Sequence, residues 1–388
     1  MNKNNLPIKI ILQKTEDIFS NRGGGTPKFF GEVTPQLQAE ISNKFESLLK
    51  FYNDVFEENE NIPAIGKVTV KPEAIAKSHK PDDLCRNCPI IGSEDLNEIY
   101  IKVKKKSIQE TVKLVMNPPS IKFKANMTAV SDIQPIKANE KITPSLILAA
   151  QKDFLSIKNN IKVKIFDFDD DFDNAQIWDY VNRKITSLGL DENCELIAYG
   201  EHIKFLKIEV NSYEDIIKIA SINGVKSVDF FQEYSLPKDD FSSADLQMLL
   251  ECEYTDTEVS IGIIDGGISD DNPYLQPYIT AREEYVSEVY RNPHHATFIA
   301  STIQYGNVLN GINSPTCHRF KFVDIIAMPN GDKKFGPTDS ISEYDLMDII
   351  EEVMDKYSHS TKIWNISLGI ENKPCSGTMS DLGMFVVI

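Results

Sequence analysis

Three mainly apolar runs in the last third of the chain constrain its fold most: Val259–Asp265, Arg319–Met328 and Lys362–Leu368. A strand that is buried on both faces has a continuous run of apolar residues, whereas in a strand with one solvent-exposed face apolar and polar residues alternate. Between the last two runs, Ser342–Tyr357 has apolar residues at helical spacing, and its first four residues have the form of a capping box. Buried strands that alternate with amphipathic helices predict a parallel α/β sheet.

Two stretches upstream of that region share one predicted element order: strand, helix, two strands, helix, strand. This is the order of the ferredoxin-like, or split β-α-β, arrangement. In the first stretch, Thr34 and Pro35 suit the N-cap and the first position of a helix. The first stretch has predicted strands at Ile8–Gln13, Lys67–Lys71, Glu98–Val103 and Ile121–Val130, with helices over 34–56 and around 108–115.

The second stretch repeats this order. Its predicted strands are Ile161–Phe168, Glu195–Tyr199, Ile203–Val210 and Val225–Phe231, and its predicted helices are Asn174–Leu188 and Ser212–Ile222. The sequence therefore predicts an α/β and α+β fold class: two ferredoxin-like β-α-β-β-α-β units followed by a partial parallel α/β domain. The predicted boundaries are 1–143, 144–238 and 239–388.

Charge and cysteine usage argue against several classes of partner. The chain has 388 residues, with 41 Lys and Arg against 58 Asp and Glu, which gives a formal charge of −17. Nucleic acid and anionic membranes would repel such a chain at long range. No apolar run reaches the ~20 residues that span a bilayer, and the first residues do not read as a signal peptide. Six scattered cysteines favour a reducing compartment, so we expect a cytoplasmic protein. From the charge and the short apolar runs we expect no nucleic-acid and no membrane partner.

The last residues, Gly383–Ile388, form an apolar run that is typical of the first half of a buried strand. Chain ends in folded domains are normally exposed and polar. We therefore expect the sequence to stop inside the α/β domain.

An acidic residue and a histidine stand where a catalytic pair is expected. Asp265 ends the first apolar strand and is followed by Gly266 and Gly267, and His295 opens a short apolar helix. In parallel α/β sheets the ligand crevice lies at the carboxyl ends of the strands. A carboxylate there can hold an imidazole in one tautomer and stabilise its protonated form, which suits a general base. The alternative is an Asp that caps a turn and a histidine on the surface.

These residues resemble the motifs of the subtilisin-like serine proteases, the subtilases. That family has D-[ST]-G at a strand end, H-G-T-x-V-A on a helix and a strand that ends in S-L-G. The chain has Asp265-Gly266-Gly267, His295-Ala296-Thr297-Phe298-Ile299-Ala300 and Ser367-Leu368-Gly369, in the order of the family. It departs from the family pattern at Gly266, which replaces Ser or Thr, and at Ala296, which replaces Gly. Pro273 and Leu275 fall where the family often has H-P-x-L, but Asn272 replaces the His of that motif.

The resemblance implies a serine endopeptidase whose substrate is a polypeptide. Asp265 would orient His295, and His295 would take the proton of a serine nucleophile. Ser367, Leu368 and Gly369 would form one wall of the substrate groove and pair with an extended peptide. This triad chemistry requires no metal and no cofactor.

Two further family elements do not occur in the sequence: the serine motif G-T-S-M-A and the asparagine that binds the oxyanion. Ser376-Gly377-Thr378-Met379-Ser380 looks like a scrambled serine motif, but it comes too early in the order of the family. We expect both elements beyond Ile388, and we expect the 388-residue chain alone to be inactive.

The resemblance also gives roles to the upstream units. Residues 160–232 resemble the ferredoxin-like propeptide that precedes many subtilases, and Phe230–Tyr234 would be the tail that enters the groove. A ferredoxin-like domain of another function is the alternative. The first unit loosely resembles N-terminal regions of large bacterial subtilases at Ala74–Pro81 and Cys88–Gly92, which implies an AAA-type ATPase as a partner.

Two other functions stay open. One is a non-catalytic truncated protein whose small domains inhibit a protease or bind another partner. The other is a pseudoprotease, which the departures at Gly266 and Ala296 favour. Elsewhere, Cys85 and Cys88 form a lone C-x-x-C pair without the four ligands of a zinc site, so we expect two ordinary thiols there.

Overall fold

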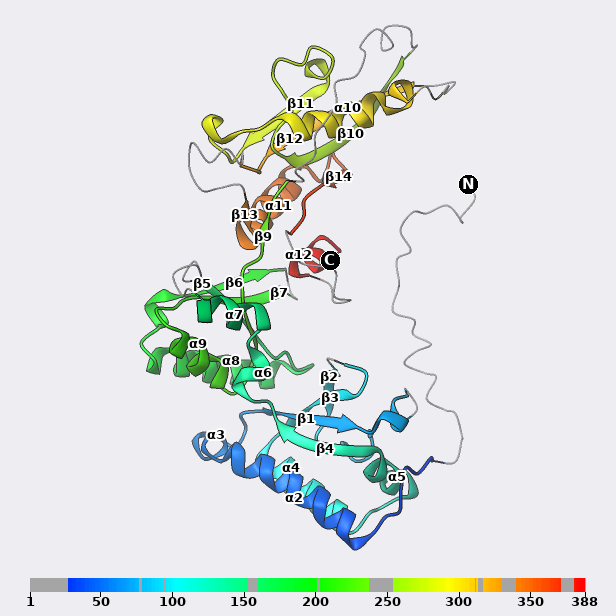
Figure 1. The fold of residues 1–388 in the computed structure, drawn as a ribbon, viewed down its shortest axis with the longest axis vertical. Helices are drawn as coiled ribbons and strands as arrows, with labels where there is room; N and C mark the ends of the chain where they lie inside the picture. The colour runs from blue at the N-terminus through cyan, green and yellow to red at the C-terminus, as the bar shows by residue number, and fades with distance from the viewer. Residues whose placement is uncertain are drawn as a thin grey trace. The chain divides into compact units, whose positions relative to one another are not determined.

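The computed structural model describes residues 27–76, 79–93, 95–152, 160–200, 203–236, 254–310, 312, 317–329, 340–370 and 380–387. The predicted strand Ile8–Gln13 and residues 376–379 of the rejected serine motif lie outside these ranges. The described chain is a mixed α/β protein with several sheets, one of them parallel, which confirms that part of the predicted fold class (Figure 1). The chain divides into two compact units, Met1–Ala198 with Lys204–Phe230 and Tyr199–Ile203 with Phe231–Ile388.

The first sheet of the first unit is antiparallel. Its elements are α2 (Pro35–Phe51), α3 (Asn53–Glu58), β1 (Ala64–Val70), β2 (Ile90–Ser93), β3 (Glu98–Val103), α4 (Lys105–Met116), α5 (Ile121–Ala129) and β4 (Val130–Pro135). The strand order is β2-β3-β1-β4, and α2 and α4 lie together along one face (Figure 1). α2 begins where the sequence predicts, because the Thr34 hydroxyl accepts the Leu37 N–H at 3.2 Å.

One prediction in this sheet is wrong. The segment Ile121–Val130 is not a strand: it forms α5, and β4 starts at its last residue. The Ser120 hydroxyl accepts the Phe123 N–H at 3.0 Å and so caps the helix. Most residues of α5 are buried, so its apolar positions show no helical period from which it could be predicted. β2 is not among the predicted strands because its 4 residues are too few to form a pattern.

The second sheet of the first unit follows its predicted order closely. Its elements are β5 (Asn160–Ile165), α8 (Asp171–Ser187), β6 (Cys194–Tyr199), β7 (Ile203–Glu209), α9 (Tyr213–Ser221) and β8 (Val225–Phe230), after two connecting helices, α6 (Ala138–Lys141) and α7 (Pro144–Lys152). The strand order is β6-β7-β5-β8, so the two sheets have the same order of strands. Asp170 and Ser212 cap α8 and α9 by accepting N–H groups three residues further on.

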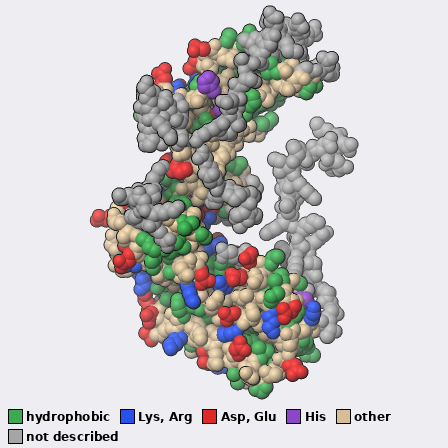
Figure 2. Space-filling view, viewed as in Figure 1, with side chains coloured by type: hydrophobic (Ala, Val, Ile, Leu, Met, Phe, Trp, Pro, Cys, Tyr) green, Lys and Arg blue, Asp and Glu red, His purple; other side chains and the backbone are tan. Residues whose placement is uncertain are grey.

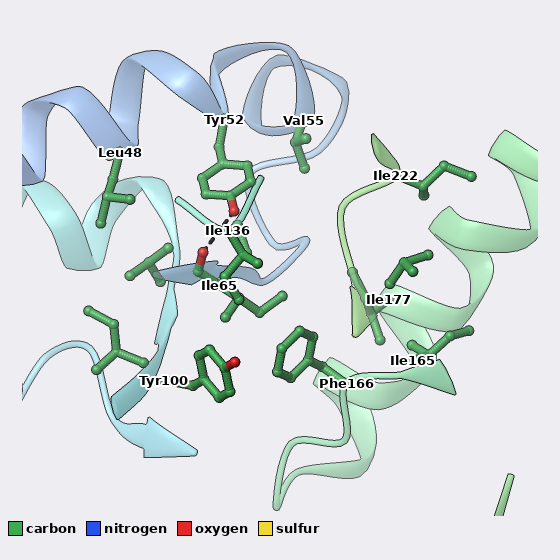
Figure 3. Close-up of a cluster of buried hydrophobic side chains, with 14 of the residues drawn as sticks. Leu48, Tyr52, Val55, Ile65, Tyr100, Ile136, Ile165, Phe166, Ile177 and Ile222 are labelled. Atoms are coloured by element: carbon green, nitrogen blue, oxygen red, sulfur yellow. Dashed lines mark hydrogen bonds between the residues drawn. The ribbon is translucent and has the colours of Figure 1, made fainter. Parts of the chain in front are cut away.

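The two sheets of the first unit share one hydrophobic core. Figure 3 shows where they meet: the rings of Tyr100 and Phe166 approach edge to face with centroids 5.4 Å apart. In the same cluster the Tyr52 hydroxyl donates to the Ile65 carbonyl at 2.7 Å, and burial raises the pKa of Tyr52. Residues predicted to belong to separate domains thus pack against each other in the first unit.

The second unit contains the parallel sheet. Its elements are β9 (Glu233–Tyr234), β10 (Tyr254–Asp265), β11 (Ile279–Glu284), α10 (His294–Leu309), β12 (Cys317–Ile326), β13 (Ile341–Ser342), α11 (Glu343–Tyr357), β14 (Ile363–Ile366) and α12 (Asp381–Val387). The sheet has the order β11-β12-β10-β14, with β12 and β14 parallel to β10 (Figure 1). α10 packs on β10 and β12. The three apolar runs therefore form adjacent strands of one parallel sheet.

The prediction of a strand at Gly383–Ile388 is also wrong. Its described residues belong to α12. Ser380 starts this helix, because its carbonyl accepts the Met384 N–H at 2.9 Å and its hydroxyl accepts the Gly383 N–H at 3.0 Å. A short apolar run does not distinguish a strand from a helix, whereas Ser followed by Asp381 is a helix-start signal.

Charged side chains of the first unit are mixed in sign. On the face shown in Figure 2, its basic side chains lie among acidic ones rather than in a patch of one sign. On α8, for example, Arg183 contacts Asp179 at 3.0 Å and Lys184 contacts Glu58 at 2.8 Å. Within the described residues, no helix is both long and apolar enough to cross a membrane.

Candidate active site

The candidate site is centred on Asp265, the last residue of β10, which is 0 % exposed. Its backbone carbonyl accepts the N–H groups of Ala327 and Met328 at 2.8 and 3.0 Å, so the strand end is fixed to the residues that follow β12. Its carboxylate accepts the Gly266 N–H at 2.6 Å through Oδ1. The other carboxylate oxygen, Oδ2, lies 2.6 Å from Nδ1 of His295.

His295 is the second residue of α10 and is 7 % exposed. The buried hydrogen bond to Asp265 fixes the plane of its ring. A carboxylate beside Nδ1 favours the tautomer that carries its proton on that nitrogen, and the lone pair of the neutral ring is then on Nε2. The pair can therefore act as an oriented base with a carboxylate that stabilises its protonated form.

The structure explains two of the three departures from the subtilase motifs, those at Gly266 and Ala296. A Cβ atom on Gly266 would lie 2.5 Å from the Asn292 carbonyl oxygen, so a Ser or Thr there requires the backbone to move. Ala296 is 0 % exposed and belongs to an apolar cluster with Ile263 and Leu275. Its methyl group thus fills a core position between α10 and the sheet.

A second buried carboxylate, Asp324 on β12, lies near the pair and was not predicted. Both of its oxygens accept the Ile268 N–H, at 3.1 and 3.0 Å, and Nε of Arg282 donates to Oδ2 at 2.8 Å. The pKa of Asp324 is raised to about 6, mainly by burial and to a smaller extent by the charge of Asp265, and against the lowering effects of the Ile268 N–H and Arg282. The signal in the sequence is a lone Asp inside the apolar run Arg319–Met328.

An extended segment of the chain, residues 232–236, lies along the second unit. Glu233 and Tyr234 form β9, which pairs antiparallel with Ser342 and Ile341 of β13. The Glu343 N–H donates to the Gln232 carbonyl at 2.8 Å, one residue earlier on the segment.

Gly369 holds the next residue of this segment. The Ser235 N–H donates to the Gly369 carbonyl at 3.0 Å, and the Gly369 N–H donates back to Ser235 at 3.1 Å. Cδ1 of Leu236 lies 3.4 Å from the Cβ position of Gly266, the residue after Asp265. The segment thus runs between β13 and Gly369 and reaches the residues beside the Asp265–His295 pair.

The predicted site residues fall into two groups. Asp265 and His295 lie together, and Gly369 exchanges backbone hydrogen bonds with an extended stretch of chain. Ser367 and Leu368 follow β14, the strand next to β10, so they lie at the same carboxyl edge as Asp265. The Ser367 hydroxyl donates to Asn365 at 2.8 Å, and both Ser367 and Leu368 are half-buried.

Metal ligands and reactive thiols are two other kinds of functional group that a site can use. Among the described residues, no group of three or more His, Cys, Asp and Glu side chains is arranged to hold a metal ion. Cys85 and Cys88 are buried free thiols, and burial raises the pKa of both. Such thiols are poor nucleophiles and poor metal ligands, because reactivity needs the thiolate.

The chain was compared with known proteins. No model of a protein family matches it, and no curated protein matches it.

Proposed function

We propose that this chain carries the acid and the base of a serine endopeptidase triad in a subtilisin-like precursor. The observation that carries the proposal is the buried contact of 2.6 Å between Asp265 Oδ2 and His295 Nδ1 at the carboxyl edge of a parallel sheet. In this function Nε2 of His295 accepts the proton of the serine hydroxyl as the oxygen attacks a peptide carbonyl. Asp265 stabilises the imidazolium that forms, and His295 then gives the proton to the leaving amine.

The extended segment 232–236 supports a polypeptide as the substrate. Backbone hydrogen bonds to Gly369 and to β13 are independent of side-chain identity, so another extended peptide can bind in the same way. The segment follows β8 directly, as a propeptide tail follows its domain. The strand order β6-β7-β5-β8, with α8 and α9 between strands, supports a ferredoxin-like propeptide for residues 160–232.

The first sheet fits the ferredoxin-like description less closely. It has the same strand order, but α2 precedes β1 instead of following it. We propose that it is an additional domain that packs on the propeptide-like sheet through the shared core shown in Figure 3.

Maturation of the protein translated from the complete reading frame tests this function. The protein should cut its own chain shortly after Leu236, and mass spectrometry of the products locates the cut. His295→Ala should abolish the cut. His294→Ala is the matched control, because this neighbouring histidine is exposed, and it should leave processing unchanged. Processing that survives His295→Ala would exclude the triad.

The nucleophile of the proposed triad is assigned to a G-T-S-x-A motif, and this sequence contains none. The proposal therefore requires that this motif and the asparagine that binds the oxyanion be supplied by sequence outside these 388 residues. A long open frame that contains neither would refute the proposal at the level of sequence.

A second candidate function is protease inhibition without catalysis, which the pairing of residues 232–235 with β13 and Gly369 favours. Because the two sheets of the first unit share a core, the protein to test is residues 1–238 rather than the second sheet alone. Mixed with an active subtilase at micromolar concentration, it should inhibit cleavage of a peptide substrate. Full protease activity under those conditions would count against both the inhibitor and the propeptide roles.

A further inference from the structure

We propose that Asp324 is a positioning residue for the Asp265–His295 pair. Its buried carboxylate fixes the turn after Asp265 and adds a second negative charge on the same face of the sheet as the Asp265 carboxylate. The inference rests on the proposed function of that pair, and it concerns a residue that the triad chemistry does not include.

The first argument is geometric. Asp324 accepts the Ile268 N–H at 3.1 and 3.0 Å, and Nη2 of Arg282 donates to the Ile268 carbonyl at 2.7 Å. Nε of Arg282 joins the two side chains at 2.8 Å. Asp324 and Arg282 therefore hold both polar groups of the Ile268 backbone.

The turn that this pair holds starts at Asp265. Its middle residue, Gly267, has φ +93°, and a Cβ atom there would lie 2.8 Å from Ile326. Only glycine adopts that conformation readily, so the turn leaves the strand at a fixed angle. A hold on Ile268 therefore constrains the backbone that carries the Asp265 carboxylate.

The sheet places the two carboxylates on one face. Asp324 is opposite Ile263 of β10 on one side and opposite Arg282 of β11 on the other. Asp265 is two residues after Ile263, and side chains two apart on a strand point to the same face. The charge of Asp265 contributes to the raised pKa of Asp324, in agreement with this placement.

The second argument is the charge balance of the buried cluster. With a neutral imidazole, Asp265, Asp324 and Arg282 sum to one negative charge, and a protonated His295 brings the sum to zero. Without the Asp324 charge, the same protonation leaves a net positive charge in a site where charge is poorly solvated. Asp324 therefore favours the imidazolium that the proposed reaction forms.

Arg282 has another acidic partner, Asp270, which provides a matched control. The side chain of Asp270 is 73 % exposed, whereas that of Asp324 is 0 % exposed. Water and salt screen an exposed charge, so Asp270 contributes little to the buried cluster.

The test is an NMR titration of the His295 ring in the 388-residue protein and in three variants. In Asp324→Asn, the ring should bind its proton about threefold more weakly or worse, a shift of the midpoint by about half a pH unit or more to lower pH. Asp270→Asn should match the parent. Asp265→Asn should give the largest shift.

The outcomes separate the inference from the function on which it rests. If Asp265→Asn leaves the ring titration unchanged, the proposed pair itself fails. If Asp265→Asn shifts the titration but Asp324→Asn matches the parent and Asp270→Asn, the role of Asp324 is overturned while the pair stands.

The parent protein gives a further readout that does not depend on the folding of any variant. The Asp324 carboxyl carbon should titrate near pH 6, and the His295 ring signals should show an inflection at the same pH. Ring signals that are insensitive to the ionisation of Asp324 would overturn the inference.

Discussion

Two buried aspartates, one from each unit of the molecule, have opposite electrostatic surroundings. Asp173, on α8 of the first unit, is 2 % exposed and meets two ammonium groups, Lys102 at 2.6 Å and Lys104 at 2.5 Å. Asp324, in the second unit, is 0 % exposed and has one cation, Arg282, with the carboxylate of Asp265 nearby. The two lysines carry more positive charge than is needed to balance Asp173. The one positive charge of Arg282 is too little to balance both Asp324 and Asp265.

The pKa values reflect this difference. Burial alone would raise the pKa of Asp173, but the hydrogen bonds from Lys102 and Lys104 outweigh it and hold the pKa below its ordinary value. For Asp324, burial dominates and raises the pKa to about 6. Burial of a carboxylate therefore does not by itself indicate its role. The excess of positive charge around Asp173 indicates a structural contact, whereas the shortage of positive charge around Asp324 indicates a site where a proton can be held or moved.

The largest effect should come from the acid of the proposed pair. In the protein translated from the complete reading frame, Asp265→Asn should lower peptide hydrolysis by about 10³–10⁴-fold, because the amide favours the wrong tautomer of His295. Asp173→Asn should leave the specific activity of the folded protein unchanged. Steady-state kinetics on a peptide substrate measure both. Equal losses in the two variants would show that the contrast between the aspartates is mistaken.

The next prediction concerns the effect of Asp173→Asn on the stability of the first unit. Asp173→Asn leaves two partly buried lysines without their shared carboxylate, so it should lower the free energy of unfolding by about 2 kcal/mol. Asp179→Asn, which removes an exposed contact to Arg183 on the same helix, should cost less than about 0.5 kcal/mol. Urea denaturation measures both. A small effect at Asp173 would contradict the structural role assigned to it.

The two aspartates should also give stability opposite pH dependences. Asp173 has a lowered pKa, so its contribution to stability is present above about pH 4 and is lost as the pH falls further. Asp324 has a raised pKa, so its contribution is present below about pH 4 and is lost as the pH rises through about 6, by up to about 3 kcal/mol.

Unfolding free energies at several pH values test this contrast. The free energy of unfolding of the parent, minus that of Asp324→Asn, should decrease as the pH rises from about 4 to about 7. The same difference for Asp173→Asn should decrease as the pH falls below about 4. If the two differences change in the same direction with pH, the surroundings assigned to one of the aspartates are wrong.

A further effect on stability concerns the turn after Asp265. Gly266→Ser introduces the residue of the subtilase motif but places a Cβ atom 2.5 Å from the Asn292 carbonyl oxygen, so it should destabilise the second unit by about 1–3 kcal/mol. Gly92→Ala is the control, since nothing lies within 4 Å of its Cβ position. Thermal melts compare the two. A Gly266→Ser protein as stable as the parent would mean that the Asn292 backbone yields easily.

The sequence predicts most strands and helices wherever burial is one-sided or a cap is present. β3 has its predicted bounds, and α2 and α9 start at their predicted caps, Thr34 and Ser212. The errors at α5 and α12 have one physical cause: short segments with many apolar residues lose the period that distinguishes a helix from a strand.

The candidate site was predictable only in part. Asp265 and His295 stand at a strand end and a helix start, where spacing and motif point to them. Asp324 and Arg282 act through register, since they are opposite each other on β12 and β11, and register is not visible in a single sequence. The contact between Ser235 and Gly369 depends in the same way on two distant segments that meet only in the fold.

The most direct measurement of the central claim is covalent labelling of the complete protein by a fluorophosphonate, which reacts with activated serine nucleophiles. If Asp265 and His295 form the acid and base of a triad, the parent and His294→Ala should be labelled on one serine, and His295→Ala should lose the label. The account is contradicted if the parent takes up no label, or if His295→Ala is labelled as fast as the parent.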